Sequence, residues 1–264
     1  MSADTKTNTE IDDDAVFEKD FFVELEDVKI HCVETGSGIP LILLHGNGED
    51  LHIFDRQAAE LKGKYRVIRL DTREHGLSVP HPDAGKEELS FREISGDITG
   101  VMDALGIEKA AFLGFSDGAN AALKTAVLYP ERVLAVVSVG GNADPSGLKF
   151  SFYLEVYLKW LLCYLPALLL PEGKRDKYRR KRRLCNLMLY HPRITGADLA
   201  GIRAPVLILT GDRDIVPERH SRYLKHRIKN SKLIVFADAV HTAMFGEQGP
   251  EYMSAIQTFL DRVL

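Results

Sequence analysis

The sequence predicts an α/β fold in which a mainly parallel sheet carries helices on both faces. Short apolar runs that suit buried strands alternate with stretches of helical periodicity along most of the chain. Polar or glycine-rich turns follow several of these runs directly, which is where open α/β sheets carry their sites. With 264 residues, the chain is long enough to bury the core of one such domain.

The predicted strands are the short apolar runs. The first two alternate in polarity and are predicted to pair antiparallel around Glu26 and Asp27, whereas the later runs suit buried parallel strands. Strands are predicted over residues 21–25, 28–35, 41–44, 65–70, 110–113, 133–139, 205–209 and 232–236.

Helices are predicted between these strands. Apolar residues spaced three and four apart indicate a helix over 51–61. Ser90 and Glu93 form a capping box before an apolar stripe that runs to Leu105. Further helices are predicted over 119–129, near 218–228 and from Pro250 onward.

The stretch between the strands at 133–139 and 205–209 holds no strand-like run. An apolar stripe at helical spacing passes through Leu154, Tyr157, Leu158, Leu161, Leu162 and Leu165. Pro166 is predicted to end this helix, and residues 174–183 then hold eight basic side chains and one acidic side chain. We therefore predict a helical cap at 143–200, inserted into a core formed by 21–142 and 201–264.

Two interpretations of this insertion stay open. In the one we favour, the apolar face of the cap covers a pocket, which suits a small-molecule substrate with an apolar portion. In the other, residues 153–183 contact an anionic membrane surface. Because Glu155, Lys159 and Pro166 interrupt the apolar stripe, no transmembrane segment is predicted.

The composition argues against several classes of partner. Hydrophobic residues make up 45% and charged residues 27% of the chain, as in globular proteins. The net charge of −4 is too small to indicate a nucleic-acid partner. Cys32, Cys163 and Cys185 lack the spacing of a metal site or a disulfide framework, so neither a metal nor a cofactor is predicted.

Residues 1–20 are rich in acidic side chains and poor in apolar ones. We predict that they form a disordered lead-in, to which no function is assigned. They contain no apolar stretch of the secretory type, so a cytoplasmic location is predicted.

Ser116 lies in a Gly-x-Ser-x-Gly turn between the strand at 110–113 and the helix at 119–129. A serine nucleophile needs an exposed Oγ, an acceptor for its proton and amide donors for the oxyanion that it creates. A sharp strand-to-helix turn exposes Oγ and aims the first free N–H groups of the helix beside it. Gly114 and Gly118 leave room for such a turn. Ser116 is therefore the predicted nucleophile.

Asp214 and His241 complete a candidate triad in the chain order that this architecture requires. His241, after the last strand, would accept the Ser116 proton and return it to the leaving group. Asp214 would orient the imidazole and stabilise its protonated form, and Asp212 is the rival acid two residues away. His220 and His226 lie on a polar helix and are predicted to be solvated.

The turn His45-Gly46-Asn47-Gly48 follows the strand at 41–44 and is rich in glycine, so its amides can approach a ligand closely. The predicted oxyanion hole is the backbone N–H of Asn47 together with that of Asp117. The side-chain amide of Asn47 either contacts substrate or serves only the turn.

In their order along the chain, these motifs resemble the α/β-hydrolase superfamily over about residues 21–264, with the insertion in the place of the family's cap domain. The resemblance implies a triad of Ser116, Asp214 and His241, since the family's Gly-x-x-Asp spacing favours Asp214 over Asp212. The segment Asp71-x-Arg-x-His-Gly-x-Ser is similar to a further family loop, but Glu74 replaces the glycine usual before the histidine. The backbone of that loop is therefore expected to differ.

The elbow Ser116-Asp117-Gly118 is similar to that of the biphenyl-hydrolase-like or valacyclovir-hydrolase group. This resemblance implies that Asp117 holds a substrate's α-amino group. The alternative is structural, because a carboxylate at a helix start is favoured by the helix dipole without any ligand.

The function expected from the chain is a serine hydrolase that cleaves a small carboxylic ester, with amides and thioesters as alternatives, through an acyl-enzyme on Ser116. The family's epoxide hydrolases and haloalkane dehalogenases carry an aspartate at the elbow, so Ser116 argues against their chemistry. Carbon–carbon bond hydrolases, haloperoxidase-like enzymes and a non-catalytic ligand-binding protein of the same fold stay as alternatives.

Overall fold

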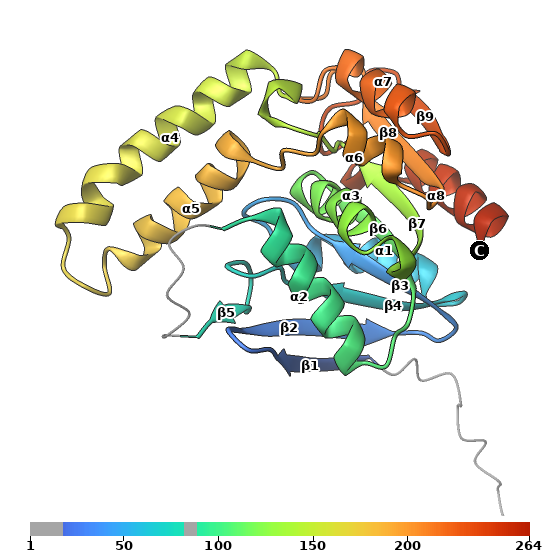
Figure 1. Ribbon diagram of the computed structural model, residues 1–264, viewed down its shortest axis with the longest axis horizontal. Coiled ribbons are helices and arrows are strands. Elements are labelled where there is room, and N and C mark those ends of the chain that lie inside the picture. Colours follow the sequence, from blue (N-terminus) through green and yellow to red (C-terminus); the bar gives the residue numbers. More distant parts are fainter. Residues whose placement is uncertain (1–17, 82–88) are drawn as a thin grey trace, which may run out of the picture.

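The computed structural model describes residues 18–81 and 89–264, and its centre is one sheet (Figure 1). The strand order is β1-β2-β4-β3-β6-β7-β8-β9, and β5 pairs with β2. The strands are β1 (Lys19–Glu24), β2 (Val28–Thr35), β3 (Ile39–Leu44), β4 (Tyr65–Leu70), β5 (Val79–Pro80), β6 (Ala110–Phe115), β7 (Val133–Val139), β8 (Val206–Gly211) and β9 (Ser231–Phe236).

The sheet is mainly parallel, as predicted. Neighbouring strands from β4 through β3, β6, β7 and β8 to β9 run parallel, whereas β2 is antiparallel to both β1 and β4. The carboxyl ends of β3, β6, β8 and β9 therefore lie at one edge of the sheet. The loops that carry the candidate site residues leave from that edge.

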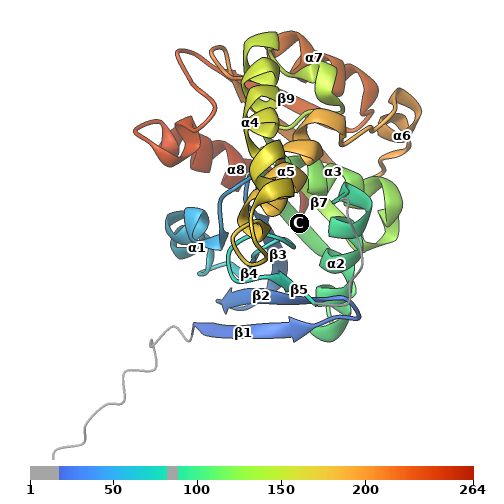
Figure 2. The same cartoon turned by 90° about the vertical axis from the view of Figure 1, so that its left-hand side faces the viewer.

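Helices cover both faces of this sheet. The helices are α1 (Asp55–Leu61), α2 (Phe91–Ala104), α3 (Asp117–Leu128), α4 (Phe150–Leu169), α5 (Asp176–Tyr190), α6 (Gly196–Gly201), α7 (Glu218–Arg227) and α8 (Gly249–Val263). Figure 2 shows α1 and α8 on one side of the strands and α2 and α3 on the other. One apolar core lies on each side, so the predicted layered α/β architecture is confirmed.

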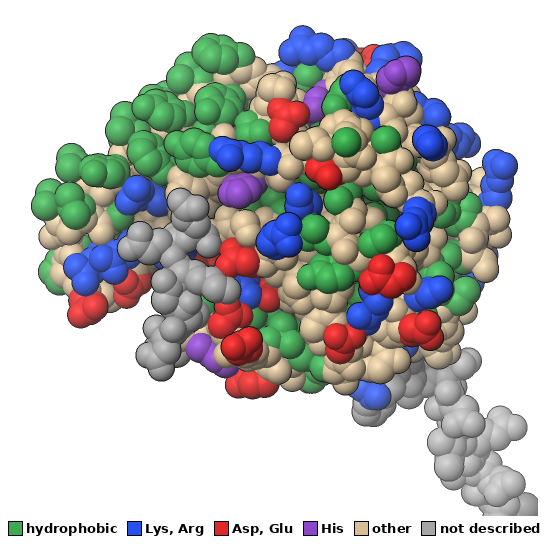
Figure 3. Space-filling view, viewed as in Figure 1, with side chains coloured by type: hydrophobic (Ala, Val, Ile, Leu, Met, Phe, Trp, Pro, Cys, Tyr) green, Lys and Arg blue, Asp and Glu red, His purple; other side chains and the backbone are tan. Residues whose placement is uncertain are grey.

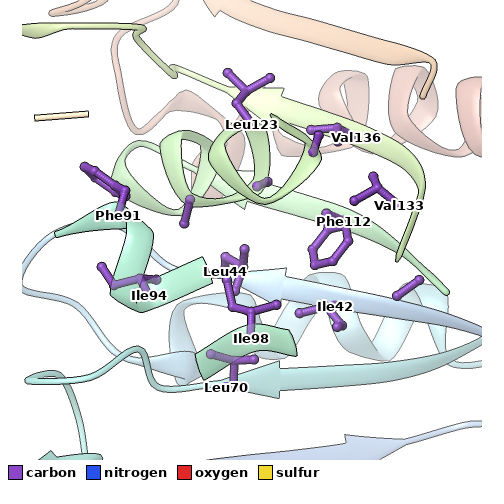
Figure 4. Packing of buried hydrophobic residues seen from close by; sticks show 14 of the residues in the cluster. Ile42, Leu44, Leu70, Phe91, Ile94, Ile98, Phe112, Leu123, Val133 and Val136 are labelled. Carbon is purple, nitrogen blue, oxygen red and sulfur yellow. The ribbon is translucent and has the colours of Figure 1, made fainter. Parts of the chain in front are cut away.

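The core under α2 shows how the predicted periodicity is used. The capping box of Ser90 and Glu93 is formed, and it starts the helix at Phe91. Phe91, Ile94 and Ile98 are buried in one apolar cluster with side chains of the strands, and Figure 4 labels them together with Leu44 and Leu70. Burial of this stripe fixes α2 against the sheet.

The start of the chain differs from the predicted lead-in. Residues 1–17 lie outside the described residues, but Lys19 and Asp20 belong to β1. Asp20 accepts a hydrogen bond from the buried His31 ring at 2.9 Å, and Glu18 pairs with Arg69. The prediction is therefore wrong for residues 18–20, where Glu18 and Asp20 have basic partners on β4 and β2.

Pro166 does not end its helix, contrary to prediction. It lies within α4, which continues to Leu169, and its carbonyl accepts from the N–H of Leu170 at 3.2 Å. Proline removes one helical donor, but here the bonds of the last turn continue beyond it.

The insertion between β7 and β8 is helical, and α4 and α5 form an antiparallel hairpin that projects beyond the sheet (Figure 1). The expectation that its apolar stripe covers a pocket is wrong. All six residues of that stripe are exposed, because α4 packs on α5 through the opposite side, where Val156 is buried against Cys185 and Leu189. Phe152 is the one α4 residue among those that line the described pocket near Ser116.

Candidate active site

Ser116 stands at the junction of β6 and α3 in a backbone conformation that side chains rarely adopt, with φ 54° and ψ −119°. The close packing of this turn leaves no room for a Cβ at either flanking glycine. A Cβ on Gly114 would lie 2.3 Å from the Gly118 carbonyl oxygen, and one on Gly118 would lie 1.9 Å from that of Leu44. The strained turn presents Oγ at the sheet edge.

Three side chains from separate loops meet at this turn. His241 Nε2 lies 3.0 Å from Ser116 Oγ, and His241 Nδ1 lies 2.6 Å from Asp214 Oδ1. With the Nδ1 proton donated to the carboxylate, Nε2 is left as the acceptor for the serine hydroxyl. Asp214 is 2% exposed and also accepts from the Val216 N–H, whereas Asp212 is exposed. The geometry therefore joins Asp214, and not Asp212, to His241.

The backbone donors predicted for an oxyanion belong to Asn47, in the turn after β3, and to Asp117, the first residue of α3. Within residues 18–81 and 89–264, neither the Asn47 N–H nor the Asp117 N–H has a hydrogen-bond acceptor. The preceding N–H, that of Gly46, is different, because it donates to Glu49 Oε2 at 2.9 Å. Two free donors next to a hydroxyl that can lose its proton are what acyl transfer requires.

The turn that carries Asn47 is held by buried His45. The ring donates from Nδ1 to the Gly46 carbonyl at 2.7 Å, and its Nε2 accepts from the Thr72 N–H at 3.0 Å. Burial lowers the pKa of His45, which keeps Nε2 free to accept. His45 therefore joins the loops after β3 and β4. By holding the Gly46 carbonyl, it also sets the direction of the Asn47 backbone N–H in the same peptide group.

Asp117 is tied by side chains rather than left open. Its two oxygens accept from Asn47 Nδ2 at 2.9 Å and from Asn120 Nδ2 at 3.1 Å. Burial raises its pKa to about 6 against the opposing effect of these two bonds. The side-chain amide of Asn47 also donates to the Leu184 carbonyl at 3.0 Å. This contact favours a structural role for that side chain over a contact with substrate. An ammonium-binding role for Asp117 stays a prediction.

Glu49 is a site residue that the sequence interpretation did not single out. Its carboxylate accepts from the Gly46 N–H, and burial raises its pKa, with Asp117 adding a smaller upward effect. It thus places a second acidic group near His241. No motif marks it, because its role follows from the tight turn of residues 46–49.

Glu74 resolves the departure from the family loop. Its φ of 68° is the left-handed conformation that glycine adopts without strain, so Glu74 keeps a backbone conformation that suits glycine, and the φ gives no sign of the expected difference. The side chain pairs with Arg183 at 2.9 Å, and its carbonyl accepts from Arg180. Glu74 therefore attaches α5 to the core, a role that a single sequence could not reveal.

The prediction that His220 is solvated is wrong. This histidine is buried rather than solvated, and its Nε2 accepts from the Ala143 N–H at 2.9 Å. Burial lowers its pKa. The polar sequence of α7 conceals this contact, because only the fold brings the Ala143 backbone to the helix.

A pocket lies against Ser116 and Asp117, with walls from both the core and the insertion. It is lined by Ser116, Asp117, Gly140, Asn142, Leu148, Phe152, Met188, His191, Ile215 and Val216. Five apolar side chains share this lining with the polar side chains of Ser116, Asp117, Asn142 and His191, so a ligand here would meet both kinds of group.

Comparisons with known proteins agree with this architecture. A family described as the alpha/beta hydrolase fold matches residues 39–181. A fluoroacetate dehalogenase of a Burkholderia species is 32% identical over 55% of this chain, but the match spans only 49% of that relative. A 2-hydroxy-6-oxononadienedioate/2-hydroxy-6-oxononatrienedioate hydrolase of Paraburkholderia phymatum is 27% identical over 89% of this chain and 91% of the relative.

Among solved structures, a putative lipase from Acinetobacter baumannii AYE matches with a TM-score of 0.77. The match covers 93% of this chain and 92% of the lipase at 21% identity, so it speaks to the fold alone. Because the family match over residues 39–181 covers more than half of the chain, the chain belongs to the α/β-hydrolase family.

Proposed function

We propose that the protein is a serine hydrolase that cleaves a small carboxylic ester through an acyl-enzyme on Ser116. The observation that carries this proposal is the continuous hydrogen-bond chain from Ser116 through His241 to Asp214. Each contact is within reach of a proton transfer, and the predicted oxyanion donors belong to Asn47, in the turn after β3, and to Asp117, the residue after Ser116.

In the first half-reaction, His241 Nε2 takes the hydroxyl proton while Ser116 Oγ attacks the carbonyl carbon. The Asn47 and Asp117 N–H groups hold the oxyanion, and loss of one such donor typically costs roughly 3–4 kcal/mol of transition-state stabilisation. The tetrahedral intermediate collapses, and the leaving alkoxide takes the proton from Nε2. Asp214 stabilises the protonated ring between these steps.

In the second half-reaction, water loses a proton to His241 Nε2 and attacks the acyl carbon. The second tetrahedral intermediate expels Ser116 Oγ, which recovers its proton from the ring, and the carboxylic acid leaves. The mechanism uses side chains and backbone of this chain throughout, so we propose that it needs neither metal nor cofactor. Activity that survives exhaustive chelation supports this point, and loss restored by added metal contradicts it.

A second candidate, carbon–carbon bond hydrolysis, is favoured by the 27% identity to a dienedioate hydrolase over most of both chains. That chemistry can use the same triad. The dehalogenase similarity is less informative here, because the enzymes with that activity in this fold carry an aspartate where this chain has Ser116.

The test is steady-state turnover of p-nitrophenyl esters from acetate to dodecanoate, beside a 2-hydroxy-6-oxo-dienoate. Ester turnover that disappears in Ser116→Ala supports the proposal, and the preferred chain length measures the pocket. Turnover of the dienoate without turnover of any ester moves the assignment to the second candidate. No turnover of either substrate class contradicts a hydrolytic role and favours ligand binding.

A further inference from the structure

The outer face of α4 is a continuous apolar surface exposed to solvent, seen along the upper left of Figure 3. Its members are between 41 and 77% exposed: Phe150, Leu154, Tyr157, Leu158, Leu161, Leu162, Tyr164, Leu165, Leu168 and Leu169. Of the 20 residues of α4, only Val156 and Ala167 are fully buried. Monomeric proteins in water rarely expose a contiguous apolar patch of this kind without a partner for it.

The charged residues of α4 lie beside this face and not within it. Leu154, Leu158, Leu161 and Leu165 follow one another at spacings of four, three and four, which aligns them along one side of the helix. Glu155 and Lys159 form an exposed i,i+4 ion pair with each other. On its outward side the helix therefore presents leucine and aromatic side chains to whatever covers it.

The helix packed beside α4 is strongly cationic. Arg182 of α5 lies over the rings of Trp160 and Tyr164, at 5.2 and 4.8 Å, so α5 cations begin at the border of the apolar face. Arg180 and Arg183 are occupied by Glu74.

Four further cations at this end of the hairpin are exposed, and none has an ion-pair partner in the part of the chain that the structure describes. They are Lys174, Lys177, Arg179 and Lys181. Cations without ion-pair partners next to an apolar face complement an anionic lipid bilayer, whose interior is apolar and whose headgroups are negatively charged.

We propose that the protein docks on anionic lipid bilayers, with α4 lying in the interface plane and Lys174, Lys177, Arg179 and Lys181 on lipid headgroups. By length and composition α4 is also long and apolar enough to cross a membrane, with a mean hydropathy of 1.3 over its most apolar window. It lies on the surface instead, because its other side packs on Cys185 and Leu189 and supplies Phe152 to the pocket.

A second copy of the chain fits this face less well. Two helices that pair through leucines need only a narrow stripe at the alternating four and three spacing. Here Leu162 and Leu169 widen the face on one side and Phe150 and Tyr157 on the other, beyond what a paired helix covers. A bilayer surface covers the full width.

The test is co-sedimentation of the full chain with vesicles of phosphatidylcholine alone or mixed with phosphatidylglycerol. The apolar variant is Leu158→Ser/Leu162→Ser/Leu165→Ser, and its matched control is Phe22→Ser/Leu77→Ser/Val79→Ser, at similarly exposed positions elsewhere. We expect the wild type and the control to bind the mixed vesicles and the α4 variant to lose binding. Because all six positions are exposed, circular dichroism should show every protein folded.

The charge variant replaces Lys174, Lys177, Arg179 and Lys181 with glutamine. Its control removes the same number of positive charges from the exposed residues Lys109, Lys225, Lys229 and Lys232. Near an anionic membrane each lost cation should weaken vesicle binding by about fivefold. The charge variant should therefore bind the mixed vesicles at least tenfold more weakly than its control. Added salt should narrow this difference.

Three results would overturn the proposal. The wild type does not bind phosphatidylglycerol vesicles even at low salt. Alternatively, each variant binds as well as its matched control. In the third, sedimentation velocity shows a dimer that the α4 leucine variant dissociates while vesicles bind neither form, which assigns the face to a second copy of the chain.

Discussion

The elbow at Ser116 and the outer face of α4 differ in how closely the rest of the molecule constrains them. A Cβ on Gly118 would meet backbone at 1.9 Å, whereas one on Gly173, in the turn between α4 and α5, meets nothing within 4 Å. The elbow is held by the sheet and three loops, whereas the outer face of α4 is exposed in the part of the chain that the structure describes. The proposed chemistry thus depends on fixed backbone geometry, and the proposed location of the protein depends on surface composition.

The largest expected effect separates the two acids of the β8 loop. Asp214→Asn should lower kcat for esters by about 10⁴-fold, because an amide cannot hold the His241 tautomer that accepts the serine proton. Asp212→Asn, at an exposed position, should change kcat less than about threefold. Stopped-flow kinetics on the two variants checks this, and equal losses would show that the hydrogen bond to Asp214 is not the functional one.

Glycine substitutions test the difference in constraint directly. Gly118→Ala should destabilise the protein by about 3 kcal/mol or more, since the Leu44 backbone cannot move without disturbing the sheet. Gly173→Ala should cost only about 1–2 kcal/mol, which is the cost of its positive φ without any clash. Urea unfolding of both variants measures the two losses. A similar loss in both would mean that the elbow is less constrained than its geometry indicates.

The buried histidines should make the core sensitive to acid. Burial lowers the pKa of His75 from 6.5 to about 3, so the folded protein leaves this ring neutral where the unfolded chain protonates it. The unfolded state then binds more protons, and the free energy of unfolding should fall as pH drops from 6.5 toward 3.

His75→Gln should flatten this pH dependence, as measured by denaturant unfolding at several pH values. Asp117 acts in the opposite direction, because its raised pKa favours the folded state as pH falls through 6. The informative quantity is therefore the difference between variant and wild type. If the free energy of unfolding of the variant falls as steeply as that of the wild type when the pH is lowered, His75 does not have a lowered pKa in the folded protein.

Asp117→Asn tests whether the candidate active site also binds a positively charged group of the substrate. If Asp117 binds an ammonium group, this change should lower kcat/KM for aminoacyl esters by about tenfold more than for simple acyl esters, since a charged hydrogen bond contributes roughly 1.5–3 kcal/mol. Below pH 6 the wild type should lose the same preference, because its carboxylate is then protonated. Equal losses on both ester classes would leave Asp117 with only its bonds to Asn47 and Asn120.

The smallest expected effect is at Glu74, which attaches α5 of the α4–α5 hairpin to the sheet domain. Glu74→Gly keeps the left-handed backbone but removes the ion pair with Arg183. Because relief of strain opposes loss of the pair, global stability should change by less than about 1 kcal/mol. Limited proteolysis in the α4–α5 turn should nevertheless become faster. Unchanged cleavage would show that the hairpin is held without Glu74.

The elements that the sequence predicted well are those whose pattern reports burial. The strand at 133–139 and the capped helix from Phe91 agree with the structure, because apolar periodicity and capping depend on residues near in sequence. The turns that hold Ser116, Asp214 and His241 were also found in sequence, since each directly follows a strand.

The failures have one cause, which is that a single sequence does not say which surface an apolar or polar side chain meets. The leucines of α4 have the pattern of a buried helix, but among residues 18–81 and 89–264 they are exposed. His220 looks solvated on a polar helix and is buried by the Ala143 backbone. Glu74 replaces a glycine and takes its conformation, because Arg183 stabilises the exchange from more than 100 residues away.

The most direct test of the central claim is to trap the acyl group. The protein is mixed with a p-nitrophenyl ester, quenched in acid within the first turnover and digested for mass spectrometry. An acyl-enzyme mechanism predicts an acyl adduct on the peptide that contains Ser116, a matching burst of p-nitrophenol, and neither in Ser116→Ala. Turnover without an adduct, or an adduct and turnover that persist in Ser116→Ala, would contradict it.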